Sequence, residues 1–268
     1  MFDLDAYLKR IGLEAPASPA EVHRAHVTSI PFEGLGPHIG EPVPLDPAAL
    51  AAKLVAGRRG GYCFEQNMLL KAAYEALGLE AEPVLARVLV GASPGEQRPR
   101  THLLLRVSYG ERMWHADVGF GAGPLIEPIP WGPGEEHEQL GWRFRVAERG
   151  ADWVLQTLDG EEWSDVYRFR PEPVPEVDIE TSNWFTATHP QSRFVAGLLV
   201  SRQLADGRRL ILSDWGGALQ LAERSPQGTD ARPVEPSELP TLLAERFGLR
   251  GFALDAEGRL TRALPGGR

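Results

Sequence analysis

The hydrophobic pattern of this chain changes near Glu82-Pro83, and this change constrains the fold more than any other feature of the sequence. Upstream, apolar residues recur at helical spacing, and a capping residue precedes proline at Ser18-Pro19 and Asp46-Pro47. Downstream, short segments with the composition of strands alternate with turn residues. Helices followed by antiparallel strands predict an α+β fold.

The predicted elements follow from this pattern. A helix is expected to begin near Cys63 and end at Gly78, and another covers residues 237–247. Residues 171–180, rich in proline and acidic side chains, predict a connector, and residues 264–268 are expected to fray. Strands of an antiparallel meander or small barrel are predicted over residues 84–90, 102–108, 113–118, 142–148, 152–160 and 162–169, and two more strands flank residues 205–207.

Composition limits the classes of protein to which the chain can belong. One cysteine in 268 residues cannot form an intrachain disulfide, so packing must provide the stability, as is usual in the cytosol. A net charge of −9 argues against a general nucleic-acid-binding protein. The N-terminus lacks the pattern of a signal peptide, and no apolar run is long enough for a membrane span. We therefore expect a soluble cytoplasmic protein that binds neither nucleic acid nor membrane.

The single cysteine, Cys63, follows Gly60-Gly61 at the predicted start of a helix. The glycines would let the backbone turn sharply and approach a ligand closely. Unpaired N–H groups and the positive end of the helix dipole favour a thiolate at this position and can stabilise an oxyanion. The alternative is a small hydrophobic core residue. A neighbouring base would favour the nucleophile.

A predicted hairpin supplies a candidate base, because its two strands carry His102 and His115. A loop of two or four residues places Ser108 opposite Met113, which makes Asp117 a diagonal neighbour of His102 on the same face. A carboxylate beside an imidazole completes a set of nucleophile, base and orienting residue. A loop of odd length would instead separate the two side chains onto opposite faces and leave an exposed polar pair.

Two other features were considered as binding sites. His23 and His26 lie at helical spacing, but no third ligand is evident, and we predict no metal site. Residues 119–123 form a glycine-rich turn directly after Asp117, where a ligand could lie close to the backbone. Backbone N–H groups in such a turn are candidates for binding an anionic group.

In combination, these segments resemble the arylamine N-acetyltransferase family. RGGYCFEQN around Cys63, Thr101-His102 and DVGFG at 117–121 are similar to the nucleophile, histidine and aspartate motifs of that family. HRAHVTSIPFEGL at 23–35 and THPQSRF at 188–194 match further landmarks. The order and spacing of these segments agree across nearly the whole chain.

The resemblance implies a papain-like or transglutaminase-like core in three parts. Residues 1–82 would form a helical bundle that carries the nucleophile, residues 83–180 a β-barrel that carries the histidine and aspartate, and residues 181–268 an α/β lid. It also implies a ping-pong acyltransferase in which acetyl-CoA is a co-substrate rather than a permanently bound cofactor. The acetyl group would pass through a cysteine thioester to the nitrogen of an arylamine or hydrazine.

The resemblance also assigns roles to individual residues. Cys63 is the implied nucleophile, His102 the base and then the acid, and Asp117 the orienting carboxylate. The residues that match positions near the acyl-donor pocket are Thr101, Phe120 and Gly121, and those that match walls of the acceptor site are Phe32 and Phe64.

Four positions bear on how closely the chain follows the family pattern. Gly34 stands where the family usually has asparagine, and Gln66 where histidine is common. Glu33 and Arg59 match an ion pair that is expected to support the cysteine loop.

Other functions share these motifs. An amide synthase that closes a macrolactam from a carrier-bound polyketide would use the same triad, and so would a cysteine hydrolase. A binding module with an inert, buried thiol is the non-enzymatic alternative. The physiological amine, the preferred acyl-CoA and the oligomeric state have no signature in the sequence.

Overall fold

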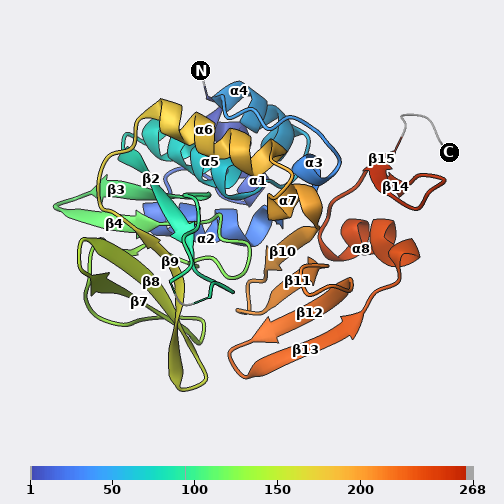
Figure 1. The fold of residues 1–268 in the computed structure, drawn as a ribbon. Helices are drawn as coiled ribbons and strands as arrows, with labels where there is room; N and C mark the ends of the chain where they lie inside the picture. Colours follow the sequence, from blue (N-terminus) through green and yellow to red (C-terminus); the bar gives the residue numbers. More distant parts are fainter. Residues whose placement is uncertain (1, 94, 264–268) are drawn as a thin grey trace.

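In the computed structural model, which describes residues 2–93 and 95–263, helices occupy the N-terminal part of the chain as predicted (Figure 1). Ser18 forms a capping box with Glu21, and the Asp46 side chain accepts a hydrogen bond from the N–H of Ala49 at 2.9 Å. The predicted fraying of residues 264–268 lies outside the described residues. The elements are α1 (Leu4–Ile11), α2 (Pro19–Ser29), α3 (Leu35–His38), α4 (Pro47–Leu50), the π-helical η1 (Ala51–Ala56) and α5 (Cys63–Ala76).

Helix α5 connects the two halves of the fold, because it packs against the other helices and against strands of the sheet. Its predicted apolar face is buried at Leu69, Leu70 and Ala73. The helix ends just before Gly78, whose φ of 80° lies in the left-handed region that glycine adopts without strain. The predicted boundaries of this helix are confirmed to within two residues.

An eight-stranded antiparallel sheet follows the helices and curls into a barrel-like shape (Figure 1). Its order is β5-β4-β3-β2-β9-β8-β7-β6. The side chain of Gln139, on one edge strand, accepts hydrogen bonds from the N–H groups of Ile126 and Glu127, just before the opposite edge strand. The strands are β2 (Glu80–Val88), β3 (His102–Tyr109), β4 (Arg112–Ala116), β5 (Ile129–Pro130), β6 (His137–Gln139), β7 (Trp142–Arg149), β8 (Asp152–Asp159) and β9 (Glu162–Phe169).

The register of the β3–β4 hairpin positions the site. Ser108 pairs with Met113, as the even-length loop predicts, and the ladder continues to Leu105 opposite Ala116. Asp117 follows directly, so it leaves β4 beside the first residues of β3. His102 and Asp117 therefore lie on the same face of the hairpin.

The C-terminal part contains a second sheet of order β1-β10-β11-β12-β13, and one of its strands, β1 (Phe32–Glu33), comes from the N-terminal part. The flanking strands predicted around residues 205–207 are β10 and β11. The predicted helix over 237–247 is α8, preceded by the 3₁₀ turn η2. The remaining elements are β10 (Leu199–Gln203), β11 (Arg209–Ser213), β12 (Gln220–Ser225), β13 (Gly228–Pro233), η2 (Pro236–Glu238), α8 (Leu239–Arg246), β14 (Phe252–Leu254) and β15 (Leu260–Arg262).

The segment 171–180 departs from its prediction as a connector. Helix α6 (Glu176–Thr188) begins inside it, and α7 (Arg193–Ala196) follows after a turn. The acidic residues that favoured a connector instead lie in the first turn of α6, where Glu176 and Asp178 interact favourably with the helix dipole. Pro175 precedes the helix, where its missing N–H is not needed.

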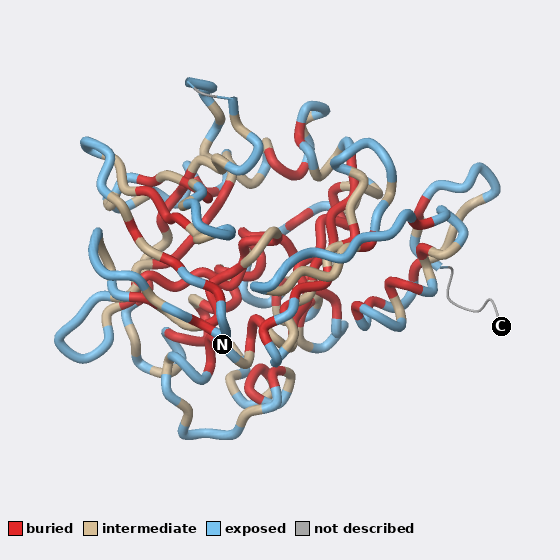
Figure 2. Tube along the Cα trace, turned by 90° about the horizontal axis from the view of Figure 1, so that it is seen from below, coloured by how far each residue is buried: buried red, intermediate tan, exposed pale blue. Residues whose placement is uncertain are grey.

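Three clusters of buried apolar side chains hold these parts together: one among the helices and the near face of the sheet, one inside the barrel, and one between α8 and the second sheet. Buried segments gather in the middle of the molecule, and exposed segments form the outer turns (Figure 2). Within the described residues, no helix combines the length and apolar character needed to cross a membrane. The division at residues 82/83 and 180/181 stays a prediction.

Candidate active site

The glycine pair before Cys63 is explained by packing. A Cβ on Gly60 would lie 2.1 Å from the carbonyl oxygen of Pro31, and one on Gly61 would lie 2.8 Å from the Cβ of Glu65. Neither glycine has a positive φ. The expectation that they permit a sharp turn or a ligand approach is therefore replaced by a requirement for close contact between the cysteine loop and its neighbours.

A buried ion pair supports this loop. Arg59 donates two hydrogen bonds to Glu33, at 2.6 and 2.9 Å, and the N–H of Gly60 donates to the same carboxylate at 3.1 Å. The predicted pair is thus confirmed. Gln66 also holds the loop in place, because its side-chain amide donates hydrogen bonds to the carbonyl groups of Pro31 and Gly61. The ion pair and the Gln66 amide together fix the position of Cys63.

The structure brings Cys63, His102 and Asp117 together. Cys63 lies at the first position of α5, and its Sγ is 3.5 Å from the carbonyl oxygen of Thr101, the residue before β3. His102 Nε2 lies 2.7 Å from Asp117 Oδ2, and the Cys63 thiol and the imidazole line the same cleft. All three side chains are buried, so an exposed polar pair is excluded.

Electrostatics couple the imidazole to the carboxylate. Burial alone would lower the pKa of His102, but the charge of Asp117 and the hydrogen bonds with Asp117 and Cys63 outweigh it and raise this pKa. Burial would raise the pKa of Asp117, but His102, Asn67 and the Gly119 N–H lower it. The site therefore favours a protonated imidazole beside an ionised carboxylate, which is the state that stabilises a thiolate.

Two side chains that the sequence analysis did not single out fix the carboxylate. Asn67 donates to Asp117 Oδ1 at 2.9 Å, and the Tyr167 hydroxyl donates to Oδ2 at 2.8 Å. Asn67 could have been found, because it lies one helical turn after Cys63 and so faces the same side of α5. Tyr167 is 50 residues from Asp117 and carries no local signal.

His23 and His26, considered above as metal ligands, have structural contacts instead. His23 Nε2 accepts a hydrogen bond from the backbone N–H of Asp117 at 3.1 Å, and Nδ1 contacts the carbonyl of Ile126. His26 lies between the Tyr7 hydroxyl and the Gln66 amide oxygen. Gln66 stands where the family commonly has histidine, and this departure places an amide oxygen against the His26 ring. Both rings hold parts of the site in place.

His115, the other histidine of the hairpin, makes no direct hydrogen bond to Asp117. Its Nε2 lies 2.8 Å from the Tyr167 hydroxyl oxygen. Because that hydroxyl already donates to Asp117, His115 must donate to it. His115 Nδ1 is buried without a partner, and burial lowers the pKa of this ring to about 4. A neutral His115 therefore orients Tyr167 toward the carboxylate.

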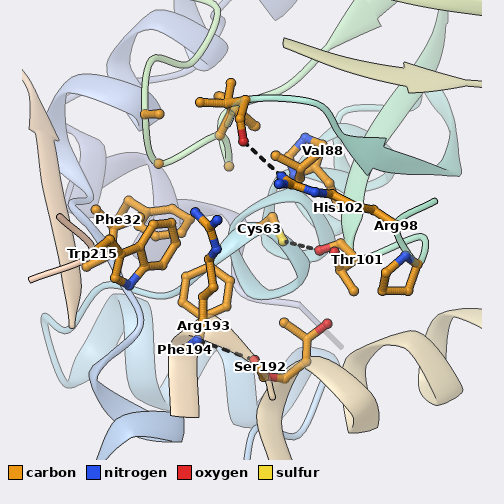
Figure 3. A pocket seen from close by; sticks show the side chains of 18 of the residues that line it. Phe32, Cys63, Val88, Arg98, Thr101, His102, Ser192, Arg193, Phe194 and Trp215 are labelled. Carbon is orange, nitrogen blue, oxygen red and sulfur yellow. Dashed lines mark hydrogen bonds between the residues drawn. The ribbon is translucent and has the colours of Figure 1, made fainter. Parts of the chain in front are cut away.

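A cleft with a volume of about 400 Å³ opens beside the thiol. In Figure 3, Cys63, His102 and Thr101 lie on one side of this cleft, and an aromatic wall lies on the other. The wall consists of Phe32, Phe194 and Trp215. Two cations, Arg98 and Arg193, also line the cleft.

The structure places most of the predicted pocket residues in this cleft. Thr101, Phe120, Gly121 and Phe32 all line it. Phe64 does not: it is fully buried and packs beside Tyr62, because adjacent helical residues point about 100° apart. Cys63 faces the cleft, and Phe64 faces the core.

The glycines of the turn after Asp117 serve packing as well. A Cβ on Gly119 would lie 2.7 Å from the Cα of Cys63, and one on Gly121 would lie 2.7 Å from the Phe32 ring. The N–H of Gly119 already donates to Asp117 at 2.9 Å. Gly34, a departure from the family pattern, has the same use, since a Cβ there would lie 2.5 Å from Phe194. The turn brings the barrel against α5.

Comparison with known proteins gives consistent results. The model of an N-acetyltransferase family matches residues 19–253. The arylamine N-acetyltransferase of Mycobacterium tuberculosis (strain H37Rv) is 33% identical, with 96% of this chain and 93% of the relative covered. A Salmonella typhimurium relative, named arylamine N-acetyltransferase / N-hydroxyarylamine O-acetyltransferase, is 34% identical over 92% of this chain and 88% of its own length.

Solved structures agree with these relatives. The structure of the Mycobacterium marinum arylamine N-acetyltransferase in complex with CoA matches with a TM-score of 0.86 and 33% sequence identity. The match covers 92% of this chain and 93% of that one. The Nocardia farcinica arylamine N-acetyltransferase matches with a TM-score of 0.84 and 38% identity, over 96% and 92% of the two chains.

Proposed function

Because the chain belongs to the arylamine N-acetyltransferase family, we propose that it transfers the acetyl group of acetyl-CoA to the nitrogen of an arylamine or hydrazine. The observation that carries this proposal is the buried set of Cys63, His102 and Asp117, in which the thiol and the imidazole line one cleft and His102 Nε2 lies 2.7 Å from Asp117. A thiol, an imidazole and a carboxylate in this order form a set suited to acyl transfer through a covalent intermediate.

In the first half-reaction, the Cys63 thiolate attacks the thioester carbonyl of acetyl-CoA while His102 holds the proton. The C–S bond to CoA then breaks, and His102 gives its proton to the departing CoA sulfur. Asp117 stabilises the imidazolium until this proton leaves. N–H groups in the first turn of α5, which have no partner within the helix, would stabilise the oxyanion.

In the second half-reaction, the amine attacks the acetyl-cysteine carbonyl. His102, now neutral, accepts the proton that the nitrogen loses as the N–C bond forms. The bond to the cysteine sulfur breaks, which regenerates the thiolate–imidazolium pair. Apart from the oxyanion, charge changes only on the thiol and the imidazole, so little reorganisation of the site is needed.

The cleft supplies the surroundings that the two substrates need. An aromatic ring of the acceptor would pack on Phe32, Phe194 and Trp215. The anionic part of acetyl-CoA would lie toward Arg193 rather than on the Gly119 N–H, which Asp117 occupies, or on Arg98, which pairs with Glu96 of the same cleft at 2.7 Å. The overall charge of −9 is no obstacle, because Arg193 is local to the cleft.

Steady-state kinetics test the proposal. Release of free CoA is measured while acetyl-CoA and the acceptor, aniline or a simple aryl hydrazine, are varied together. A ping-pong mechanism gives parallel lines in a double-reciprocal plot. Intersecting lines would show that both substrates must be bound at once and would contradict a free acetyl-enzyme. Release of CoA at the same rate without any amine would indicate a hydrolase instead.

A further inference from the structure

A second polar cluster lies on the face of the eight-stranded sheet opposite to the barrel interior. On β2, Ala86 belongs to the barrel core, so the next side chain, Arg87, points to the opposite face. Arg87 pairs directly with Arg168 of β9, and Arg170 follows two residues later on the same face. Asp152, at the start of β8, also reaches this face. The register therefore brings three guanidinium groups together around one carboxylate.

The segment 97–101 covers this cluster from the side. It contributes Arg100 and Gln97 to the walls of a cavity of about 440 Å³, which the sheet arginines also line. Arg168 donates to the Gln97 amide oxygen at 3.2 Å, and Arg87 donates to the carbonyl of Arg98. A pocket with four arginines, hereafter the arginine pocket, is thus built from three strands and one loop.

The charges in the arginine pocket do not balance. Asp152 pairs with Arg170 at 3.1 Å, and Glu172 pairs with Arg100 at 3.3 Å. Among the described residues, Arg87 and Arg168 have no carboxylate within ion-pair distance. Arg168 Nε is buried without any hydrogen-bond partner.

Such an arrangement is unfavourable in the absence of a ligand. Like charges directly opposite each other on neighbouring strands repel, and an unsatisfied buried donor loses its solvation. Burial, together with the charges of Arg100 and Arg168, lowers the pKa of Arg87, which reports the same repulsion. A bound anion would offset the repulsion between these guanidinium groups.

We propose that the arginine pocket binds a phosphate group. The two guanidinium groups without a carboxylate match the charge of a phosphate dianion, and their planar forks of donors match its oxygen atoms. The inference goes beyond the proposed acetyl transfer, and phosphate binding can be tested without any enzymatic assay.

The phosphate could come from either of two sources. Segment 97–101 separates the arginine pocket from the catalytic cleft, because Arg98, Pro99 and Thr101 line the cleft while Gln97 and Arg100 line the pocket. A phosphate of the bound acyl-CoA is therefore one source. Inorganic phosphate or an unrelated phosphate ester is the other.

Thermal unfolding of the full chain in inorganic phosphate tests the site itself. Ionic strength is held constant with sodium chloride, since screening alone changes surface electrostatics. We expect phosphate at about ten times its Kd to raise the unfolding midpoint by about 3 °C. Arg168→Gln and, separately, Arg87→Gln should abolish this rise. Arg250→Gln, which removes one exposed positive charge far along the chain, should preserve it.

Kinetics then identify the source. If the phosphate belongs to acyl-CoA, Arg168→Gln raises KM for acetyl-CoA about tenfold with little change in kcat, as expected for the loss of a charged hydrogen bond. Acetyl-dephospho-CoA, which lacks the 3′-phosphate, shows whether that group is the one bound. If KM is unchanged while the phosphate-dependent stabilisation is lost, the ligand is a separate phosphate. Equal midpoints in phosphate and chloride, or a rise that survives both substitutions, would overturn the proposal.

Discussion

The triad and the arginine pocket are both dense clusters of charged groups, but only the triad is electrostatically complete. The Asp117 carboxylate receives hydrogen bonds from His102, Asn67, Tyr167 and the Gly119 N–H. In the arginine pocket, four guanidinium groups meet two carboxylates, and Arg168 Nε has no partner. The difference indicates that the triad is preorganised for charge that forms during a reaction, whereas the pocket is arranged to receive charge from outside.

Removal of the triad's fixed charge should have the largest effect. Asp117→Asn keeps the shape of the side chain but leaves the imidazolium without its anionic partner, and it disturbs the tautomer of His102. We expect kcat/KM to fall by about 10³–10⁴-fold with acetyl-CoA and aniline. Asp230→Asn, the same change at an exposed position on β13, is the control and should be neutral. A loss smaller than tenfold would show that the charge of Asp117 is not needed.

The buried histidines around the triad should respond to acid differently from the arginine pocket. Burial lowers the pKa of His23 to about 4, of His26 to about 3 and of His115 to about 4. Below about pH 6.5 the unfolded chain takes up protons on these residues and the folded chain does not, so stability falls as the pH decreases from about 6.5 toward 4. The slope is about 1.4 kcal/mol per pH unit for each histidine. His102 has a raised pKa, so its contribution is complete below about pH 6.5 and decreases only as the pH rises above it.

Urea unfolding at pH 6.5 and pH 5 measures this difference. Arginine does not titrate in this range, so Arg168→Gln should change the absolute stability without changing the slope against pH. A free energy of unfolding that is the same at both pH values would contradict the neutral, buried state of the three histidines.

The smallest effect is expected in the arginine pocket without phosphate. There, Arg168→Gln relieves the repulsion with Arg87 directly opposite, and we expect the free energy of unfolding to rise by about 0.5 kcal/mol. Urea unfolding in chloride buffer measures it, with Arg250→Gln as the variant of equal charge. Destabilisation relative to Arg250→Gln would mean that Arg168 is satisfied within the protein and that the charges already balance.

The contrast between the clusters also shows what the sequence could and could not predict. The alternation of β3 and β4 determines which residues share a face, so His102 and Asp117 could be placed together from a loop length alone. The start of α5 could be placed because the residues at a helix boundary form a recognisable local pattern in the sequence. Asn67 follows from helical spacing.

Other features depend on contacts between distant segments. Tyr167 reaches Asp117 only because β9 pairs with β2, and Arg168 meets Arg87 for the same reason. The reason for the glycines beside Cys63 is the backbone of Pro31, which no local pattern reveals. The acidic residues of 176–180 suit both a loop and the first turn of a helix, so local composition predicts a connector where α6 begins.

Mass spectrometry of the intact protein after incubation with acetyl-CoA alone tests the central claim most directly. The account predicts the addition of one acetyl group, located on the peptide that contains Cys63, and its removal as N-acetylaniline when aniline is added. Cys63→Ser should show neither step, because a serine hydroxyl is a far weaker nucleophile in a site built around a thiolate. No acetyl group on Cys63 with acetyl-CoA, while iodoacetamide still alkylates the thiol, would contradict the account.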